Sequence, residues 1–200
     1  MQATHVAAIE AFGPAGYDDR QVRAWATTEG DPDLALDDPD ERVVVAGPEP
    51  GEEPPNAEGV APSDADPSTD AETEAADAGY DPDPDLAGFG HVALDGVRSA
   101  PERRAAALAD RETAEVIAVY VHPAYARSGL GTRLLRWHEA RARERSCEVV
   151  GLLASQNAVG FYERRGYESL AEVTIENTGR VEMPTTWMER DLDRSGYSSR

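Results

Sequence analysis

The sequence predicts an α/β fold of the α+β kind, with one mixed central sheet flanked by helices. Two observations predict it. Residues 115–121 and 148–154 are short, nearly unbroken apolar runs with the length of buried strands. Residues 129–145, between these runs, repeat apolar side chains at helical spacing. A strand, a helix and a second strand in this order form a right-handed βαβ unit, in which the two strands are parallel.

Shorter elements precede this unit. They are expected as helices at residues 4–12, 18–28 and 101–110 and as strands at residues 42–46 and 87–94. In the second helix Val22, Trp25 and Ala26 form an apolar face at helical spacing. Pro101 is expected at an early position of the Ala-rich third helix, where a missing N–H costs nothing.

The second half of the chain is more regular. The long helix has a continuous apolar side, made by Leu130, Leu134, Leu135, His138 and Ala142. After the second buried strand, residues 157–164 are expected as a short helix that Gly166 closes in a left-handed conformation. Residues 167–175 and 181–192 are predicted as two antiparallel strands that complete the sheet.

Residues 48–86 differ from the rest in composition. They hold 13 acidic residues, no basic residue and 8 of the 14 prolines, with almost no large apolar side chains. Such a segment cannot bury enough surface to offset its ordering entropy. Because the pieces on either side are too small to fold separately, we predict a disordered acidic insert within a single domain that spans residues 1–200.

The charge excludes several functions. The formal net charge is -20, and all 19 basic residues are arginine. A chain without lysine lacks the residue that phosphate-loop NTPases, protein kinases and pyridoxal enzymes need. The acidic balance also argues against nucleic acid and anionic membranes as partners, because both carry negative charge.

The acidity extends beyond the insert, since the remaining residues still have a net charge of -7. Excess acid without lysine is typical of proteins of salt-accumulating, halophilic organisms, in which salt screens surface repulsion. A disordered acidic segment alone is the simpler alternative. No apolar run approaches 18 residues and the first 20 residues contain acids, so a cytoplasmic location is expected. The single Cys147 and four scattered histidines predict no disulfide and no metal site.

A glycine-containing turn joins the first buried strand to the long helix. In Arg127-Ser-Gly-Leu-Gly-Thr132, Gly129 and Gly131 allow a tight turn and a close approach of the backbone to a ligand. The free N–H groups of the first helical turn favour an anion, most naturally a pyrophosphate, and Arg127 and Arg133 can add donors. The alternative is a tight turn in which the glycines serve packing only.

A second motif follows the second buried strand. Asn157 lies at the start of the short helix, and Tyr162, five residues later, could face the cleft between the two parallel strands. The alternative is that Asn157 only caps the helix and that Phe161 and Tyr162 only fill the core.

Together the two motifs resemble the GNAT superfamily of acyl-CoA-dependent N-acyltransferases. The resemblance covers residues 114–167, as AEVIAVYVHPAYARSGLGTRLL and then SQNAVGFYERRGY. It implies a GNAT fold in which the parallel strands splay apart and the pantetheine arm of acetyl-CoA lies between them. It also implies an N-acetyltransferase that passes the acetyl group directly to an amine, with Cys147 inert and no metal.

The resemblance assigns roles to individual residues. Backbone groups of Val119, Tyr120 and Val121 would pair with the pantetheine arm, and Asn157 would contact it. Tyr162 would give its proton to the leaving thiolate as general acid. The pyrophosphate would be held by the backbone amides of Arg127, Ser128, Gly129, Leu130, Gly131 and Thr132.

Glu115 is the candidate general base. It lies 14 residues before Gly129, a spacing that resembles the glutamate base of histone-acetylating members of the superfamily. Deprotonating an amine with a pKa near 10.4 at pH 7 costs roughly 4.6 kcal/mol, which makes a base worthwhile. The alternative is that Glu115 is a solvated charge at the end of a strand.

We therefore expect acetylation of a primary amine, on a small molecule or a protein. The C-terminal strands could join two copies of the enzyme as a homodimer. A catalytically silent acyl-CoA sensor with the same fold is the main alternative. An interaction protein whose acidic insert recruits a basic partner is the third.

Overall fold

The computed structural model describes residues 1–27, 38–47, 55 and 86–192. Its six-stranded mixed sheet has the order β1-β2-β3-β4-β6-β5. The strands are β1 (Glu41–Ala46), β2 (Gly88–Ala93), β3 (Thr113–Val121), β4 (Val149–Ser155), β5 (Glu168–Asn177) and β6 (Val181–Asp191). The helices are α1 (Gln2–Phe12), α2 (Asp19–Ala26), α3 (Glu102–Leu108), α4 (Leu130–Glu144) and α5 (Val159–Glu163). Short 3-10 turns are η1 (Gly13–Ala15), η2 (Pro123–Tyr125), η3 (Gln156–Ala158) and η4 (Thr178–Arg180).

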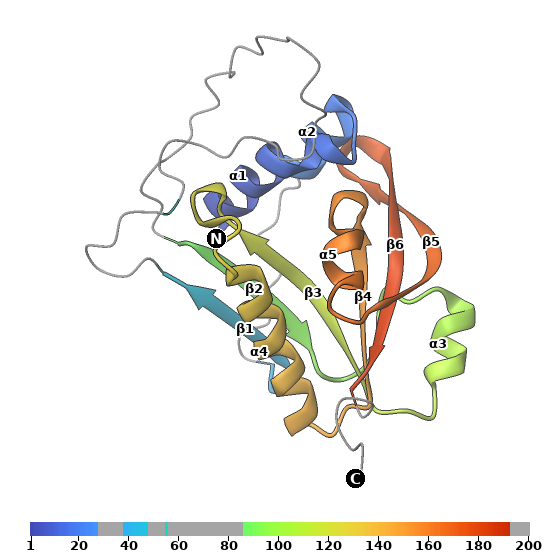
Figure 1. Ribbon diagram of the computed structural model, residues 1–200. Coiled ribbons are helices and arrows are strands. Elements are labelled where there is room, and N and C mark those ends of the chain that lie inside the picture. Colours follow the sequence, from blue (N-terminus) through green and yellow to red (C-terminus); the bar gives the residue numbers. More distant parts are fainter. Residues whose placement is uncertain (28–37, 48–54, 56–85, 193–200) are drawn as a thin grey trace.

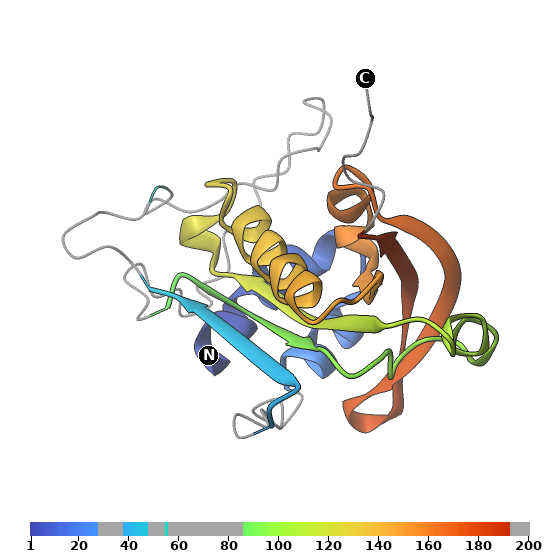
Figure 2. The same ribbon diagram turned by 90° about the horizontal axis from the view of Figure 1, so that it is seen from below.

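Helices cover both faces of the sheet. Helix α4 lies across one face, over β2 and β3, while α1 and α2 lie on the opposite face (Figures 1 and 2). The predicted α/β class with a mixed sheet is thereby confirmed. No helix in the described ranges combines the length and the apolar character that crossing a bilayer requires.

Every predicted helix and strand is present, with small differences at the ends. Pro101 is the N-cap of α3 and not one of its helical residues. The helix predicted at residues 157–164 consists of the turn η3 followed by α5, and Gly166 has the expected positive φ of 85°. The predicted acidic insert falls outside the described residues except for Pro55 and Leu86; it connects β1 and β2, which pair as antiparallel neighbours.

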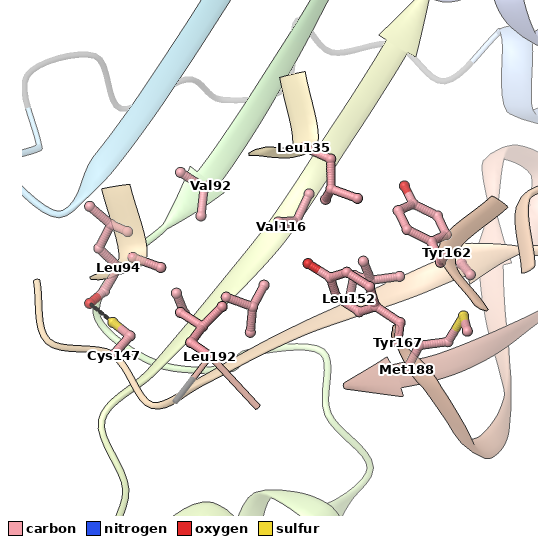
Figure 3. Packing of buried hydrophobic residues seen from close by; sticks show 14 residues of the cluster. Val92, Leu94, Val116, Leu135, Cys147, Leu152, Tyr162, Tyr167, Met188 and Leu192 are labelled. Atoms are coloured by element: carbon pink, nitrogen blue, oxygen red, sulfur yellow. Dashed lines mark hydrogen bonds between the residues drawn. The ribbon is translucent and has the colours of Figure 1, made fainter. Parts of the chain in front are cut away.

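The main core lies between the sheet and helices α4 and α5. All five apolar-side residues predicted for α4 are buried. Val92, Val116 and Leu152 from three strands pack there against Leu135 of α4 and Tyr162 of α5 (Figure 3). This burial fixes the start of α4 and the position of α5 relative to the parallel strands.

The two parallel strands separate partway along their length. Their register runs from Thr113 opposite Val149 to Val116 opposite Leu152, whereas β3 continues to Val121. A β-bulge in the pairing of β2 with β3 falls at Ile117, where the separation begins. Figure 1 shows the two arrows diverging, with α5 beside the wider end. The splayed strand pair is therefore present.

The register of β2 with β3 assigns side chains to the two faces. Val92 lies opposite Val116 on the face covered by α4. Because side chains alternate along a strand, the neighbouring pairs of β2 and β3 lie on the other face, which we call the α1 face. These pairs are Phe89 with Tyr120, His91 with Ala118, and Ala93 with Glu115.

Candidate functional site

The first turn of α4 lies beside the wider end of the gap between β3 and β4. Gly129 has φ 85° and ψ 0°, and Arg127 has φ 61°, so the chain turns through two left-handed residues before the helix begins. No side chain caps the helix. The N–H groups of its first turn therefore lack helical acceptors, and the positive end of the helix dipole faces outward. The anion site that the glycine turn predicts would lie at these N–H groups.

Glycine is favoured at the two positions of this turn for different reasons. A side chain at Gly129 would meet no atom, so its positive φ is what favours glycine there. Gly131 is helical, and an added Cβ would lie 3.5 Å from the Phe161 ring and 3.6 Å from Val121. The absent Cβ at Gly131 thus leaves space on the side of the helix that faces β3 and α5.

Five arginines surround this helix end. They are Arg127, Arg133 and Arg136 from the turn and α4, and Arg164 and Arg165 from the end of α5. Among described residues none of the five forms an ion pair, although acids outnumber bases two to one in the chain. Burial, followed by the charges of Arg164 and Arg136, lowers the pKa of Arg165. Uncompensated cations this close together favour an anionic ligand.

Arg165 is held in place by α4 and α5 together. Its Nε and Nη2 donate to the hydroxyl oxygen of Thr132 at 3.1 and 2.5 Å, and its Nη1 donates to the carbonyl of Phe161. The guanidinium carbon lies 3.6 Å from the centre of the Phe161 ring, a cation–π contact. Sequence reasoning missed Arg165; the consecutive arginines that follow Phe161-Tyr162 were the available signal.

Tyr162 lies at the junction of the gap and the core. Its ring contacts the rings of Phe161 and Tyr167. Burial, and secondarily the neighbouring Tyr120, raises the pKa of Tyr162 above its ordinary value. The hydroxyl therefore keeps its proton at neutral pH, as a general acid requires.

The predicted backbone contacts of β3 lie past the separation point. Val119, Tyr120 and Val121 pair with β2 on one side, whereas the register with β4 has already ended. Val119 and Val121 pack toward Leu130 under α4. The Tyr120 ring lies on the α1 face and stacks on Phe89, and burial raises its pKa to about 12.

Asn157 and Tyr17 connect this region to the N-terminal helices. Asn157 lies in η3 and does not cap α5; its side-chain amide donates to the carbonyl of Phe12 at 3.1 Å. The Tyr17 hydroxyl donates to the carbonyl of Pro184 and accepts from the N–H of Gln156. These bonds fix α1 and α2 across the ends of β4 and β6.

Glu115 is 2% exposed and lies on the α1 face. The alternative of a solvated strand-end charge is therefore wrong. Its Oε2 accepts the backbone N–H groups of Arg98 at 2.5 Å and Ser99 at 2.9 Å. The carboxylate thus anchors the loop that follows β2 and also lies two residues before the bulge.

A second buried acid lies on the same row of the sheet. Glu41 of β1 pairs with Ala93, which in turn pairs with Glu115. Its carboxylate contacts Nε2 of His91 and accepts from Nη1 of Arg98 at 2.5 Å. Sequence reasoning did not find this cluster, because Glu41 and His91 are separated by 50 residues that include the acidic segment.

The remaining sequence candidates are structural. Cys147 is buried in the main core, and burial raises the pKa of its thiol. His122 is buried, and its Nδ1 accepts the N–H of Ala124 at the end of β3. Within the described ranges no group of three or more His, Cys, Asp or Glu side chains is arranged to hold a metal ion.

Comparison with known proteins agrees with this geometry. A sequence model described as the acetyltransferase (GNAT) family matches residues 50–167. The GCN5-related N-acetyltransferase from Rhodopseudomonas palustris is 20% identical, with a TM-score of 0.58 over 95% of this chain and 86% of that chain. The PaiA N-acetyltransferase from Thermoplasma acidophilum, solved in complex with coenzyme A, is 16% identical, with a TM-score of 0.51 over 95% and 92% of the two chains. The search of curated proteins gives no match. The solved structures share the fold.

Proposed function

The chain belongs to the acetyltransferase (GNAT) family, and we propose that it transfers an acetyl group from acetyl-CoA directly to a primary amine. The observation that carries the proposal is the uncapped first turn of α4 at the wider end of the splayed strands, together with arginines that form no ion pair within the described residues. This combination fits acetyl-CoA, because acetyl-CoA has a diphosphate and a thioester arm that needs an extended channel.

Each part of the carrier has a place in this proposal. The amides of residues 127–132 and the arginines around them bind the diphosphate. The pantetheine arm lies along Val119, Tyr120 and Val121, whose edge no longer pairs with β4. Asn157 contacts the arm through the oxygen of its side chain, because its amide nitrogen is used by Phe12. The thioester then lies near Ile117, between Tyr162 on one face and Glu115 on the other.

The chemistry follows from these positions. Glu115 removes one proton from the ammonium group, and the neutral amine attacks the thioester carbonyl. When the tetrahedral intermediate collapses, the C–S bond breaks and Tyr162 protonates the thiolate. Tyr162 regains the second proton of the amine nitrogen, and the products are an amide and free CoA. Both residues are buried, so the charges that develop are little screened by water.

Arg133→Glu tests the coenzyme site. This exposed arginine lies in the first turn of α4, and reversing its charge should weaken acetyl-CoA binding at least tenfold, or by about 1.4 kcal/mol. Binding is measured by thermal shift and calorimetry at the lowest salt in which the protein is folded. Arg103→Glu is the matched control, since Arg103 is also exposed, in the first turn of α3, and without an ion pair among described residues. If acetyl-CoA stabilises neither the natural chain nor the control, the assignment fails.

The family also leaves open a catalytically silent acyl-CoA sensor. The positions of Glu115 and Tyr162 on opposite faces of the gap favour the enzyme. Release of free CoA thiol with a panel of primary amines separates the two functions. A chain that binds acetyl-CoA and releases no thiol above the background rate with any amine would be a sensor.

Glu115→Gln is expected to lower kcat/KM by about 10²- to 10⁴-fold at pH 7 and by much less at pH 10. The amide oxygen of glutamine can still accept from Arg98 and Ser99, so the loop is retained while the base is lost. The defect shrinks at alkaline pH because an alkylamine with a pKa near 10.4 is then largely neutral without help. Glu112→Gln, an exposed acid just before β3, is the control. A defect that does not change with pH would remove Glu115 from proton transfer.

A further inference from the structure

The Glu41–His91 pair on the α1 face is not used by the function proposed above. His91 is 4% exposed, and its Nε2 lies against Oε2 of Glu41. Its other ring nitrogen, Nδ1, is buried and has no hydrogen-bond partner within the described part of the chain. Buried polar atoms are nearly always hydrogen-bonded, so an unpartnered one at a candidate site points to a bound group.

The contact with Glu41 decides what Nδ1 can do. A carboxylate only accepts hydrogen bonds, so the neutral imidazole places its proton on Nε2. Nδ1 is then a bare acceptor. The other oxygen of Glu41 accepts from Arg98, which holds the carboxylate and, through it, the ring.

Glu115 presents a second acceptor on the same face. Its Oε2 is occupied by two backbone N–H groups, whereas its Oε1 has no donor among described residues. Because Ala93 pairs with Glu115 and His91 pairs with Ala118, His91 and Glu115 are diagonal neighbours on adjacent strands. Such neighbours lie about 7–8 Å apart at their backbones, which side chains can span. Arg98 links them directly, with its N–H on Glu115 and its guanidinium on Glu41.

The surrounding charge favours a cation. Among described residues, the charged and titratable groups around His91 are Glu41 and Arg42 of β1, Asp95 and Arg98 of the loop after β2, Glu115 of β3 and, through the sheet, His138 of α4. Three carboxylates are present with two guanidinium groups, which leaves a surplus of negative charge. An ammonium ion compensates this surplus, whereas an anion or a neutral alcohol does not.

We propose that Nδ1 of His91 and Oε1 of Glu115 form a two-acceptor site for the ammonium group of a primary amine. The inference rests on the proposed acetyl transfer and names the group that orients the amine. One N–H of the ammonium group loses its proton to Glu115, while a second stays bonded to His91. The lone pair so exposed attacks the thioester, and Glu115 returns its proton to water after the turnover. Removal of the acceptor at Nδ1 should therefore weaken binding of the amine.

The test uses the full chain, acetyl-CoA and the primary amine with the highest kcat/KM in the panel. In His91→Phe the KM for the amine should rise about tenfold or more, because a hydrogen bond from a charged group to a buried acceptor is lost. The kcat should change by less than about threefold. The KM for acetyl-CoA should not change.

His5→Phe is the control, because His5 contacts Tyr120 on the same face but lies outside the pair. His91→Gln is the second variant, since its amide nitrogen can still donate to Glu41 while the ring acceptor Nδ1 is removed. An unchanged KM for the amine in a folded His91 variant would overturn the inference and leave acetyl transfer intact. Failure of both variants to fold would assign His91 a structural role and overturn it as well. If the natural chain does not bind acetyl-CoA, by contrast, the result counts against the proposed function itself.

Discussion

Replacing Gly151 with alanine is expected to destabilise the folded protein by about 3 kcal/mol. A Cβ at this position would lie 2.4 Å from the Trp187 ring and 3.2 Å from Val97. Trp187 is fully buried, and its indole N–H donates to Glu189 at 2.7 Å, so the ring cannot move without breaking that bond. The clash lies beside the site, because Gly151 pairs with both Glu115 and Glu189.

Urea unfolding of the two proteins at pH 7 and one fixed salt concentration measures this effect. Gly131→Ala is the control, since its Cβ makes only ordinary contacts and lies in a helix, where alanine is favoured over glycine. Adding Trp187→Phe should recover part of the loss, because the atoms that clash belong to the larger indole ring. A Gly151→Ala protein as stable as the natural chain would show that the indole has room to shift.

The sequence predicted the parts of the fold that depend on local pattern. Apolar spacing within α4 and the runs in β3 and β4 are set by neighbours in the chain, so their positions could be read directly. The glycine turn was also local, because the positive φ of Gly129 and the uncapped helix start follow from a few consecutive residues.

The contacts made between distant segments could not be predicted. The Glu41–His91 pair depends on the register of β1 with β2, and the bonds from Arg165 to Thr132 depend on how α5 packs beside α4. The hydrogen bond from Tyr17 to Pro184 joins residues that lie near opposite ends of the sequence. Periodicity indicates which face of a strand is buried, but a shift of two residues preserves the faces and changes every partner. The sequence likewise could not decide whether Glu115 is exposed, because its burial depends on the loop of Arg98 and Ser99, which folds over it.

The second large effect is expected on acidification, through His138. This residue lies on the side of α4 that faces the sheet and is fully buried, and neither ring nitrogen has a hydrogen-bond partner among described residues. The ring rests on the backbone of Gly90, where an added Cβ would lie 2.1 Å from Nε2. Burial, with a smaller contribution from His91, lowers the pKa of His138 from 6.5 to about 3.

A lowered histidine pKa means that the unfolded chain binds the proton first. The stability that depends on a neutral His138 is therefore fully present above pH 6.5, and it is lost as the pH falls from 6.5 toward 3. Each pH unit in this window costs a little over 1 kcal/mol, so the loss at pH 4.5 is about 3 kcal/mol. Other groups also respond to acid, so the informative quantity is a difference between variants.

His138→Leu should remove this part of the acid sensitivity. Leucine fills a similar volume and leaves no unpaired nitrogen, so stability at pH 7 should be retained or raised. Between pH 7 and pH 4.5 the variant should lose about 3 kcal/mol less than the natural chain in urea unfolding. His5→Leu is the control, because burial lowers the pKa of this half-buried histidine too, yet far less of its ring is enclosed. Equal acid sensitivity in His138→Leu and the natural chain would mean that the imidazole is protonated in the fold, and Gly90 would then have to accommodate a charged ring within the core.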